Sequence, residues 1–416
     1  MREINYQQNL LERFIPVNIE ELITTLSNRQ ELSATDKSDF QLFCQHYRAL
    51  YHALSLPDYQ KLRHHYAPFN PDRDSLSNLN YSDAEKQALQ DKLLDDLKNL
   101  LNDANYEQLS QEQLNAVLHE TSPYGVKVSV DFNEFEEILL FYRGSAIRKE
   151  ERREWKSLFL KKEIIETKIY RRLFILLKSK SLTQKIQELA AAKNISQSKA
   201  ERKIKHKHDQ NSIDDEKIYI KLFKNIPRTD LEMLFPNTKV RMRLLDKFKL
   251  GITGGGGTVG GIMTVVTKLT ATIDPIAMAT TIFGFIGLLW RQISKIFLQR
   301  TKYMAELAKN LYYYNLDNNL GAISHLHDMA AASEAKEALL SYFFLLTEGE
   351  MTAAELDKKI ELFIEEEYRV AIDFEVDDGL GKLERLGLLI QKEDKVSVVD
   401  LSDAENILKQ KWLACF

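Results

Sequence analysis

The sequence predicts a mostly helical α+β protein that carries a two-helix transmembrane hairpin. Three observations lead to this fold class. Apolar residues recur at helical three-and-four spacing near both ends of the chain. Strand-like alternation of apolar and polar residues begins near Tyr124, in the middle of the chain. Two long uncharged stretches follow each other in the second half of the 416 residues.

We expect the chain to be divided into five segments. They are a helical domain (1–121), an α+β domain (122–240) with a basic helical insertion (182–215), a transmembrane hairpin (241–300), a helical connector (301–347) and a winged-helix-like domain (348–416). Stretches such as "IEELITTLSNRQ" predict the N-terminal helices, and two prolines in Pro68–Asp74 interrupt them.

The central domain contains four candidate strands. "GVKVSVD" alternates apolar and polar residues, and "FEEILLFYRG" ends at Gly144. Further strands are expected at 170–180 and 217–227. We expect a charged helix between the second and third strands, over about 146–166.

The last part of the chain has the element order of a winged-helix module. Three helical patterns precede a strand pair, "LLIQKEDKVSVVD". Thr352 with Glu355 forms a capping box that predicts the start of the second helix.

The predicted hairpin consists of spans at 250–267 and 275–293. Eighteen uncharged residues run from Leu250 to Thr267, and 16 run from Pro275 to Trp290. As helices they would be about 27 and 24 Å long, against a hydrocarbon core of about 30 Å. The predicted membrane-interface residues are Lys247, Lys249, Trp290, Arg291 and Lys295. Basic flanks at both ends place both termini in the cytoplasm.

The stretch "GITGGGGTVGG" holds seven of the 16 glycines in the chain. Small residues four apart allow two helices to approach closely in lipid. The predicted helix-packing residues are Gly256, Gly257, Gly260, Gly261, Gly284 and Gly287. We therefore expect a homo-oligomer whose hairpins form a scaffold or a pore.

Two alternatives stay open for this stretch. Gly255-x-Gly257-x-x-Gly260 matches a dinucleotide-binding fingerprint, with Asp274 at the spacing of a ribose-binding acid. That alternative predicts a nucleotide-binding enzyme, but no alternating strands and helices follow over 275–385. The other alternative is a hairpin buried in the core of a soluble interaction protein.

Charge is distributed unevenly, although the net charge is only −4. From Arg148 to His208 there are 19 Lys/Arg against seven Asp/Glu, and from Glu334 to Asp400 eight against 18. The basic middle is suited to an anionic surface and the acidic end to a protein partner. An amphipathic basic helix, "IRKEERREWKSLFLKK", supplies the candidate lipid-binding residues Arg152, Arg153, Lys161 and Lys162. An acidic end is poorly suited to nucleic acid.

No pattern of residues predicts catalysis, a cofactor or a metal. Two cysteines, Cys44 and Cys415, are too few for a disulfide framework or a cysteine metal site. His46, His52, His64 and His65 gather in one helical region, but the first gap of six is wrong for ligands on one helix face. "HLHD" at 325–328 has no apparent partner group. No residue therefore argues for enzyme activity, and a non-enzymatic protein is favoured over an enzyme without excluding one.

The chain resembles the transmembrane protein 143 family. The resemblance rests on "RFIPVNIEELI", "HYRALYH", "YRRLFILLK", "KIYIKLFKNIPRTDLEMLFP", the glycine-rich pair of apolar stretches and "DFEVDDGLGKLERLGL". It covers most of the chain and implies a membrane protein with a hairpin of spans and large soluble parts. It supplies no activity and no catalytic residues. Because the N-terminal stretch carries Glu3 and Glu12, unlike a presequence, a bacterial-type inner membrane is expected.

Overall fold

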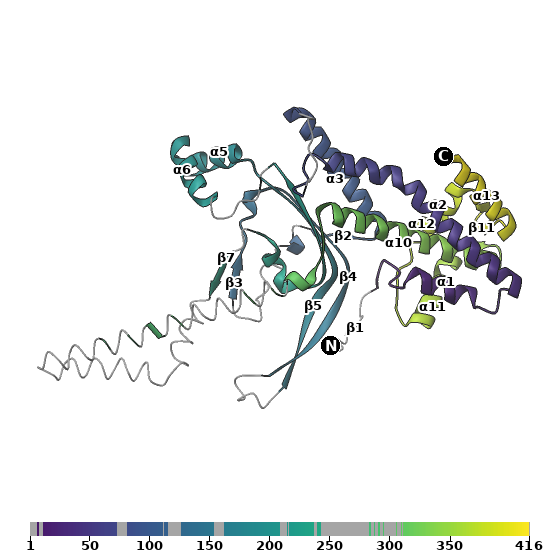
Figure 1. The fold of residues 1–416 in the computed structure, drawn as a ribbon. Coiled ribbons are helices and arrows are strands. Elements are labelled where there is room, and N and C mark those ends of the chain that lie inside the picture. Colours follow the sequence, from purple (N-terminus) through teal and green to yellow (C-terminus); the bar gives the residue numbers. More distant parts are fainter. Residues whose placement is uncertain are drawn as a thin grey trace, which may run out of the picture.

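The structure is a computed structural model of the full chain. It describes residues 6–7, 11–72, 81–110, 112–114, 126–153, 162–208, 214, 216–236, 239–242 and 311–415, and the single positions 283, 287, 290, 291, 294, 305 and 309. These residues form a mixed α+β protein that is mostly helical and contains antiparallel sheets (Figure 1). The predicted fold class is confirmed at this level.

A six-stranded antiparallel sheet forms the centre of the described part. Its main path runs through β1 (Tyr6–Gln7), β4 (Phe135–Arg153), β5 (Lys162–Ser179), β6 (Ile218–Pro227) and β8 (Asn315–Asn318), and β2 (Glu107–Gln108) pairs with β4. β4 and β5 are 19 and 18 residues long. Figure 1 shows the far end of this hairpin projecting away from the helices.

Helices cover one face of the sheet. On this face, Leu139 of β4, Leu176 of β5 and Ile220 of β6 lie opposite one another in a single row. α3 (Asp83–Asp103) and the first half of α10 (Asn319–Glu348) pack against that row and close a buried core. The apolar faces that period-2 alternation gives the strands and period-3.6 spacing gives the helices therefore pack against each other.

The opposite face is covered by a 3-10 segment, η3 (Arg228–Leu234). Its Leu231 packs in one core with Leu173 of β5. Another short 3-10 segment, η1 (Phe132–Glu134), precedes β4. Beside this core, two short strands form a separate antiparallel pair, β3 (Val126–Ser129) with β7 (Lys239–Met242).

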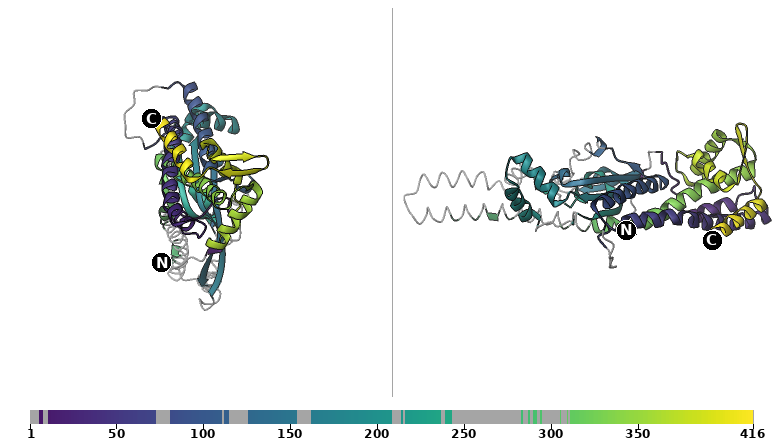
Figure 2. Two further views of the ribbon diagram at one scale, coloured as in Figure 1. Left: turned by 90° about the vertical axis from the view of Figure 1, so that its right-hand side faces the viewer. Right: turned by 90° about the horizontal axis from the view of Figure 1, so that it is seen from above.

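Two long helices connect the sheet to the C-terminal part. α2 (Ala34–Tyr66) and α10 lie side by side along the molecule (Figure 2). α10 belongs to two cores, because Ile323 packs against the sheet and Phe343 packs against the C-terminal helices. Residues 333–345 of α10 are accordingly buried without a break.

The C-terminal part is built on a small three-stranded sheet of order β10-β11-β9. Its elements are β9 (Met351–Thr352), α11 (Ala353–Tyr368), α12 (Val376–Leu386), β10 (Leu389–Lys392), β11 (Lys395–Val398) and α13 (Leu401–Ala414). The predicted capping box is confirmed, since the side chains of Thr352 and Glu355 bond each other's backbone N–H groups. α1 (Ile19–Ser27) and the first half of α2 complete the same core, so both ends of the chain fold together.

The predicted helix over 146–166 is wrong. Residues 146–153 belong to β4 and 162–166 to β5. Among the described strands, residues 162–168 of β5, which precede Ile169, pair only with β4, and the opposite part of β4 pairs with β5 and the short β1. A two-stranded ribbon buries neither face fully, so it has no need of the alternating pattern by which strands are predicted.

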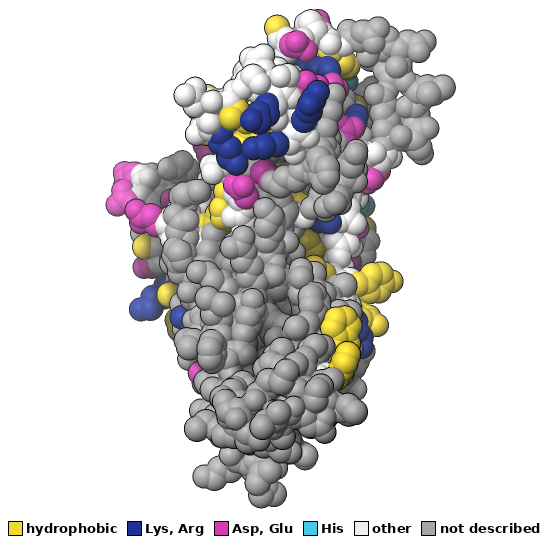
Figure 3. Space-filling view, turned by 90° about the vertical axis from the view of Figure 1, so that its left-hand side faces the viewer, with side chains coloured by type: hydrophobic (Ala, Val, Ile, Leu, Met, Phe, Trp, Pro, Cys, Tyr) yellow, Lys and Arg dark blue, Asp and Glu magenta, His cyan; other side chains and the backbone are white. Residues whose placement is uncertain are grey.

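Two helices lie within the range of the predicted basic helical insertion, 182–215. α5 (Leu182–Lys193) ends at Asn194, whose left-handed φ of 48° stops the helix, and α6 (Gln197–His208) follows. Exposed basic side chains on this pair are Lys193, Lys199, Arg202 and Lys203. Figure 3 shows Lys and Arg side chains gathered at this end of the molecule.

The predicted spans, 250–267 and 275–293, lie outside the described residues except for positions 283, 287, 290 and 291. Among the helices that the structure does describe, none is both long and apolar enough to cross a membrane. The hairpin and the five-part division of the chain stay predictions.

Candidate functional site

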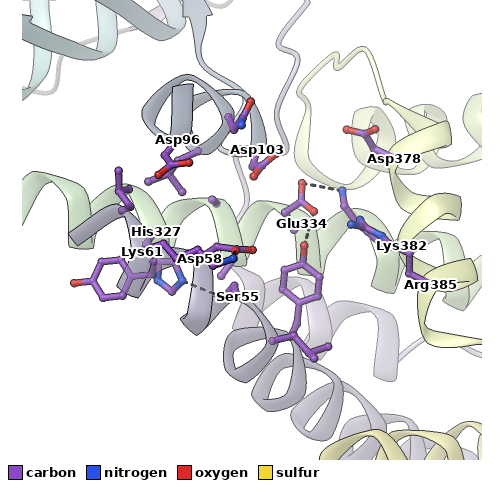
Figure 4. A pocket seen from close by; sticks show the side chains of 18 of the residues that line it. Ser55, Asp58, Lys61, Asp96, Asp103, His327, Glu334, Asp378, Lys382 and Arg385 are labelled. Carbon is purple, nitrogen blue, oxygen red and sulfur yellow. Dashed lines mark hydrogen bonds and ion pairs between the residues drawn. The ribbon is translucent and has the colours of Figure 1, made fainter. Parts of the chain in front are cut away.

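A cavity of about 680 Å³ opens between α2, α3, α10 and α12 (Figure 4). Its lining mixes acidic and basic groups. The ionisable side chains around it include Asp58, Lys61, Asp96, Asp103, His327, Glu334, Asp378, Lys382, Arg385 and Lys411. Such a concentration of charge beside a helix that is buried on all sides makes this cavity the best candidate for a site.

Three charged side chains lie at the inner end of the cavity. Glu334 and Glu337 are one turn apart on α10, and Lys382 reaches both from α12. The Lys382 ammonium lies 3.1 Å from Glu334 Oε1 and contacts Glu337 Oε2 still more closely. Lys382 is only 2 % exposed, so the ion pairs are shielded from water and salt.

Neutral donors satisfy the remaining oxygens of this cluster. The Tyr51 hydroxyl donates to Glu334 Oε2 at 2.6 Å, and Asn105 Nδ2 donates to Glu337 Oε1 at 3.0 Å. Burial raises the pKa of both glutamates, while the two carboxylates together raise the pKa of Lys382 against its own burial. Two carboxyls sharing one ammonium favour retention of a proton by one carboxyl.

α12 approaches α10 closely at this point because Gly379 has no side chain. A Cβ at Gly379 would lie 2.5 Å from Ser341 Oγ and 3.0 Å from the Glu337 carbonyl oxygen. Lys382, three residues further along α12, is thereby brought onto the Glu337 carboxylate. The stretch "VDDGLGKLERL" thus combines a close-approach glycine, a buried cation and the core leucines Leu383 and Leu386.

His327 forms the other end of the cavity. Its Nε2 lies 3.0 Å from Ser55 Oγ, and its ring stacks on Tyr59 at 4.6 Å between centroids. The His52 ring lies 5.3 Å away, edge to face. Burial and the neighbouring His52 lower the pKa of His327, so its neutral form is favoured.

Two groups of side chains have the spacing of metal ligands. One is His52, His327 and Asp328, and the other is Glu334, Glu337 and Asp378. In the second group the Lys382 ammonium already contacts both glutamates. In the first, the Asp328 side chain is 74 % exposed, and His327 Nε2 already faces Ser55. Neither group has the undivided, inward-facing ligand set of a protein metal site.

The buried polar groups of this cavity therefore bond to one another. Their arrangement fixes α12 on α10, while ionisable groups at the rim, such as Arg385 and Asp378, remain for contact with a polar ligand. Ser55 and His327 place a hydroxyl beside an imidazole, but the Ser55 hydroxyl donates to the His52 carbonyl oxygen at 2.9 Å. The carboxylate next to His327 Nδ1, Asp328, lies 3.7 Å away with its side chain 74 % exposed, so the pair is not ordered as an activated nucleophile. The geometry is that of an ionic lock between two helices.

The other histidines of the sequence analysis are dispersed. His46 lies 2.8 Å from Glu405, His65 lies 2.7 Å from Asp96, and His325 lies 2.7 Å from Asp317. Cys44 is buried in the C-terminal core. The structure brings His52 and His327 together, a pairing that the sequence did not indicate.

Most of the predicted membrane-site residues lie outside the described residues. These are Gly256, Gly257, Gly260, Gly261, Gly284, Lys247, Lys249 and Lys295. Gly287, Trp290 and Arg291 are described, and all three are helical and exposed. None of the three lines the cavity between α10 and α12.

Three of the candidate lipid-binding residues, Arg152, Arg153 and Lys162, lie at the far end of the β4–β5 hairpin and not on a helix. Arg152 is paired in register with Glu163, and Arg153 with Lys162. Lys161 lies outside the described residues. The described residues 148–153 and 162 therefore belong to strands and not to the predicted amphipathic helix. Contact of these residues with lipid stays a prediction.

Residues 135–321 match a family model described as a protein of unknown function (DUF3754). The match runs from the start of β4 to the first turn of α10 and covers less than half of the chain. No solved structure matches the chain. The chain thus contains a domain of unknown function, and the inner cluster of the cavity lies C-terminal to it.

Sequence reasoning missed Glu334, Glu337 and Lys382 as a cluster. The signal was present in "SEAKEALLSYFF", where three charges interrupt an apolar helix. A charge inside such a stretch needs a buried partner. The partner, Lys382, lies 45 residues further from Glu337, so its identity required the three-dimensional structure.

Proposed function

We propose that the protein is a membrane-anchored, self-associating scaffold whose helical hairpin lies at 250–267 and 275–293. The observation that carries the proposal is the pair of uncharged stretches with basic residues on both outer sides. The resemblance to the transmembrane protein 143 family supports the same proposal. An inner membrane of bacterial type, with both termini in the cytoplasm, is the location proposed.

A described helical stripe supports the anchor. Phe283, Gly287, Trp290 and Ser294 follow at intervals of four, three and four, which places them on one face of a helix. Phe283 is 73 % and Trp290 71 % exposed, and a Cβ at Gly287 would meet no atom within 4 Å. Since the described residues do not cover this face, we propose that lipid or a second copy covers it.

The basic helices α5 and α6 are suited to the same environment. Their exposed side chains Lys193, Lys199, Arg202 and Lys203 form a surface that anionic headgroups would attract (Figure 3). The excess of Lys and Arg in this part of the sequence supports a position of these helices next to anionic headgroups.

The C-terminal part is proposed as a winged-helix-like module that binds a protein partner. In such a module α12 would be the helix that reads DNA, and its Lys382 is buried between two glutamates. Asp377, Asp378 and Glu384 of α12 add negative charge. Phosphate neutralisation requires exposed cations, so an acidic helix favours a protein partner.

Fractionation tests the anchor. We expect the full chain to stay in the membrane pellet after washing with alkaline carbonate, which releases peripheral proteins. Recovery in the supernatant would favour the soluble interaction protein. A rise in melting temperature with NAD or ATP that is lost in Gly257→Ala would instead favour the nucleotide-binding enzyme.

A further inference from the structure

A second cavity, of about 420 Å³, lies where the N-terminal segment 14–18 crosses the sheet beside α10. Four cations line it: Arg143 of β4, Arg171 and Arg172 of β5, and Lys336 of α10. None of the described residues that line it is acidic. It is separate from the cavity between α10 and α12, with which it shares no lining residue.

The strand register places three of the cations of this region in one row. Arg143, Arg172 and Lys224 lie directly opposite one another across β4, β5 and β6. This row lies on the face of the sheet toward α10, next to an apolar row of Phe141, Phe174 and Leu222. Like charges directly opposite each other destabilise an antiparallel sheet unless an anion compensates them.

Arg143 is the most deeply buried cation of this row, and burial of an unpaired charge destabilises the fold. It is 6 % exposed, and its buried Nε has no hydrogen-bond partner. Its guanidinium carbon lies 4.3 Å from the centre of the Phe14 ring, which fixes the plane of the group. Burial lowers the pKa of Arg143 to about 10, so the guanidinium stays charged at neutral pH.

Lys336 adds a second buried cation. Its Nζ donates to the carbonyl oxygens of Ile15 at 2.6 Å and Val17 at 3.3 Å. These bonds hold the N-terminal segment over the cavity but bring no negative charge. Burial and the charge on Arg143 lower the pKa of Lys336 to about 7.

Of the carboxylates near this set, Glu12 pairs with Arg171, and Glu337 is engaged with other groups. Glu12 lies 3.9 Å from Arg171 Nε, and Glu337 is already bonded to Lys382 and Asn105. Within the described residues, no carboxylate forms an ion pair with Arg143, Arg172 or Lys336. Two arginines, joined by Lys336 when it is protonated, therefore converge on one cavity without a paired carboxylate among the described residues.

We propose that this cavity binds a phosphate group, either of a soluble phosphorylated ligand or of a phospholipid headgroup. A phosphate presents several acceptor oxygens and about two negative charges, and arginine binds it through two parallel N–H···O bonds. Bound there, it accepts from the free Nε of Arg143 and compensates the row of cations. The inference stands independently of the membrane anchor.

The test uses the full chain in a non-ionic detergent, with binding followed by calorimetry and by melting temperature. The probes are inorganic phosphate, pyrophosphate and short-chain phosphatidic acid, each against chloride at equal ionic strength. Arg143→Met removes the buried guanidinium, and Arg172→Gln is the second variant. Arg48→Met is the matched control, since Arg48 pairs with Glu20 and is not among the described residues that line the cavity.

We expect pyrophosphate to bind the wild type and Arg48→Met equally, and to bind Arg143→Met about 10- to 100-fold more weakly. Without ligand, Arg143→Met is expected to melt no lower than the wild type, because an unpaired buried charge has been removed. A purely structural arginine would give the opposite pair of results.

The two sources of phosphate give different outcomes. Phosphatidic acid that binds at least tenfold more tightly than pyrophosphate, and depends on Arg143, assigns the cavity to a lipid headgroup. Equal or weaker binding of phosphatidic acid assigns it to a soluble ligand. The proposal is overturned if no probe raises the melting temperature above the chloride control, or if Arg143→Met and Arg172→Gln respond as the wild type does.

Discussion

Two lysines on neighbouring helices illustrate how their partners decide the charge of a buried residue. Lys382 of α12 lies between the carboxylates of Glu334 and Glu337, which raise its pKa. Lys336 of α10 is bonded to two backbone carbonyls, and burial lowers its pKa to about 7. The first is held as an ammonium, while the second is close to losing its proton at neutral pH.

Replacing Lys382 tests the ionic lock. We expect Lys382→Met to lower the free energy of unfolding at pH 7 by about 3–5 kcal/mol, because two buried carboxylates lose the cation that pairs with both of them. The loss should be smaller at pH 5, since the raised pKa values of Glu334 and Glu337 favour protonation there. Denaturant unfolding at the two pH values measures the difference.

A compensated variant controls for lost packing. Lys382→Met combined with Glu334→Gln and Glu337→Gln should recover much of the stability at pH 7, because no buried charge remains. If the free energy of unfolding of Lys382→Met lay within about 1 kcal/mol of the wild-type value at both pH values, the ionic lock would be contradicted.

Lys336 predicts a pH dependence of stability. Its folded pKa, about 7, lies below the ordinary 10.5, so the unfolded chain binds the extra proton between these values. The stability of the wild type relative to Lys336→Met should therefore increase from pH 7 to 10, by at most about 1.4 kcal/mol per pH unit. Unfolding curves in phosphate-free buffer measure it, and a difference that is flat or falls with pH would contradict it.

At the scale of elements, the sequence predicted helices better than the long hairpin. Local patterns of sequence predict α5, α6 and the order of the C-terminal helices. The capping box at Thr352 is likewise a pattern that lies within one helical turn. The β4–β5 hairpin extends beyond the sheet as a charged ribbon, so its outer half lacks period-2 alternation. Burial, and not strand formation itself, produces that alternation.

The glycine-rich stretch gives a prediction about helix packing. We expect Gly257→Leu with Gly261→Leu to reduce the size of the detergent-solubilised assembly, because leucine side chains keep the helices apart. Gly381→Leu is the matched control, since a Cβ there meets no atom within 4 Å. Light scattering coupled to size exclusion measures the mass, and an unchanged mass for the double variant would count against glycine-mediated association.

At the scale of the whole molecule, the cores join segments that are far apart in the sequence. Phe40 and Phe43 of α2 pack with Tyr342 and Phe343 of α10, about 300 residues later. Local periodicity identifies which faces are apolar but not which faces meet. The phosphate cavity was likewise hidden from the sequence, because its cations come from β4, β5 and α10.

Residues 245–300 include both predicted spans, 250–267 and 275–293. This gives a matched pair of proteins for the central claim: the full chain, and a variant in which a short Gly/Ser linker replaces residues 245–300. Thermal unfolding of the variant would establish that its body still folds.

The most direct measurement is the distribution of these two proteins between pellet and supernatant after alkaline carbonate extraction of membranes. Anchoring by the hairpin predicts the full chain in the pellet and the folded deletion variant in the supernatant. A full chain that is released into the supernatant, or a folded deletion variant that stays in the pellet, would contradict anchoring by the hairpin.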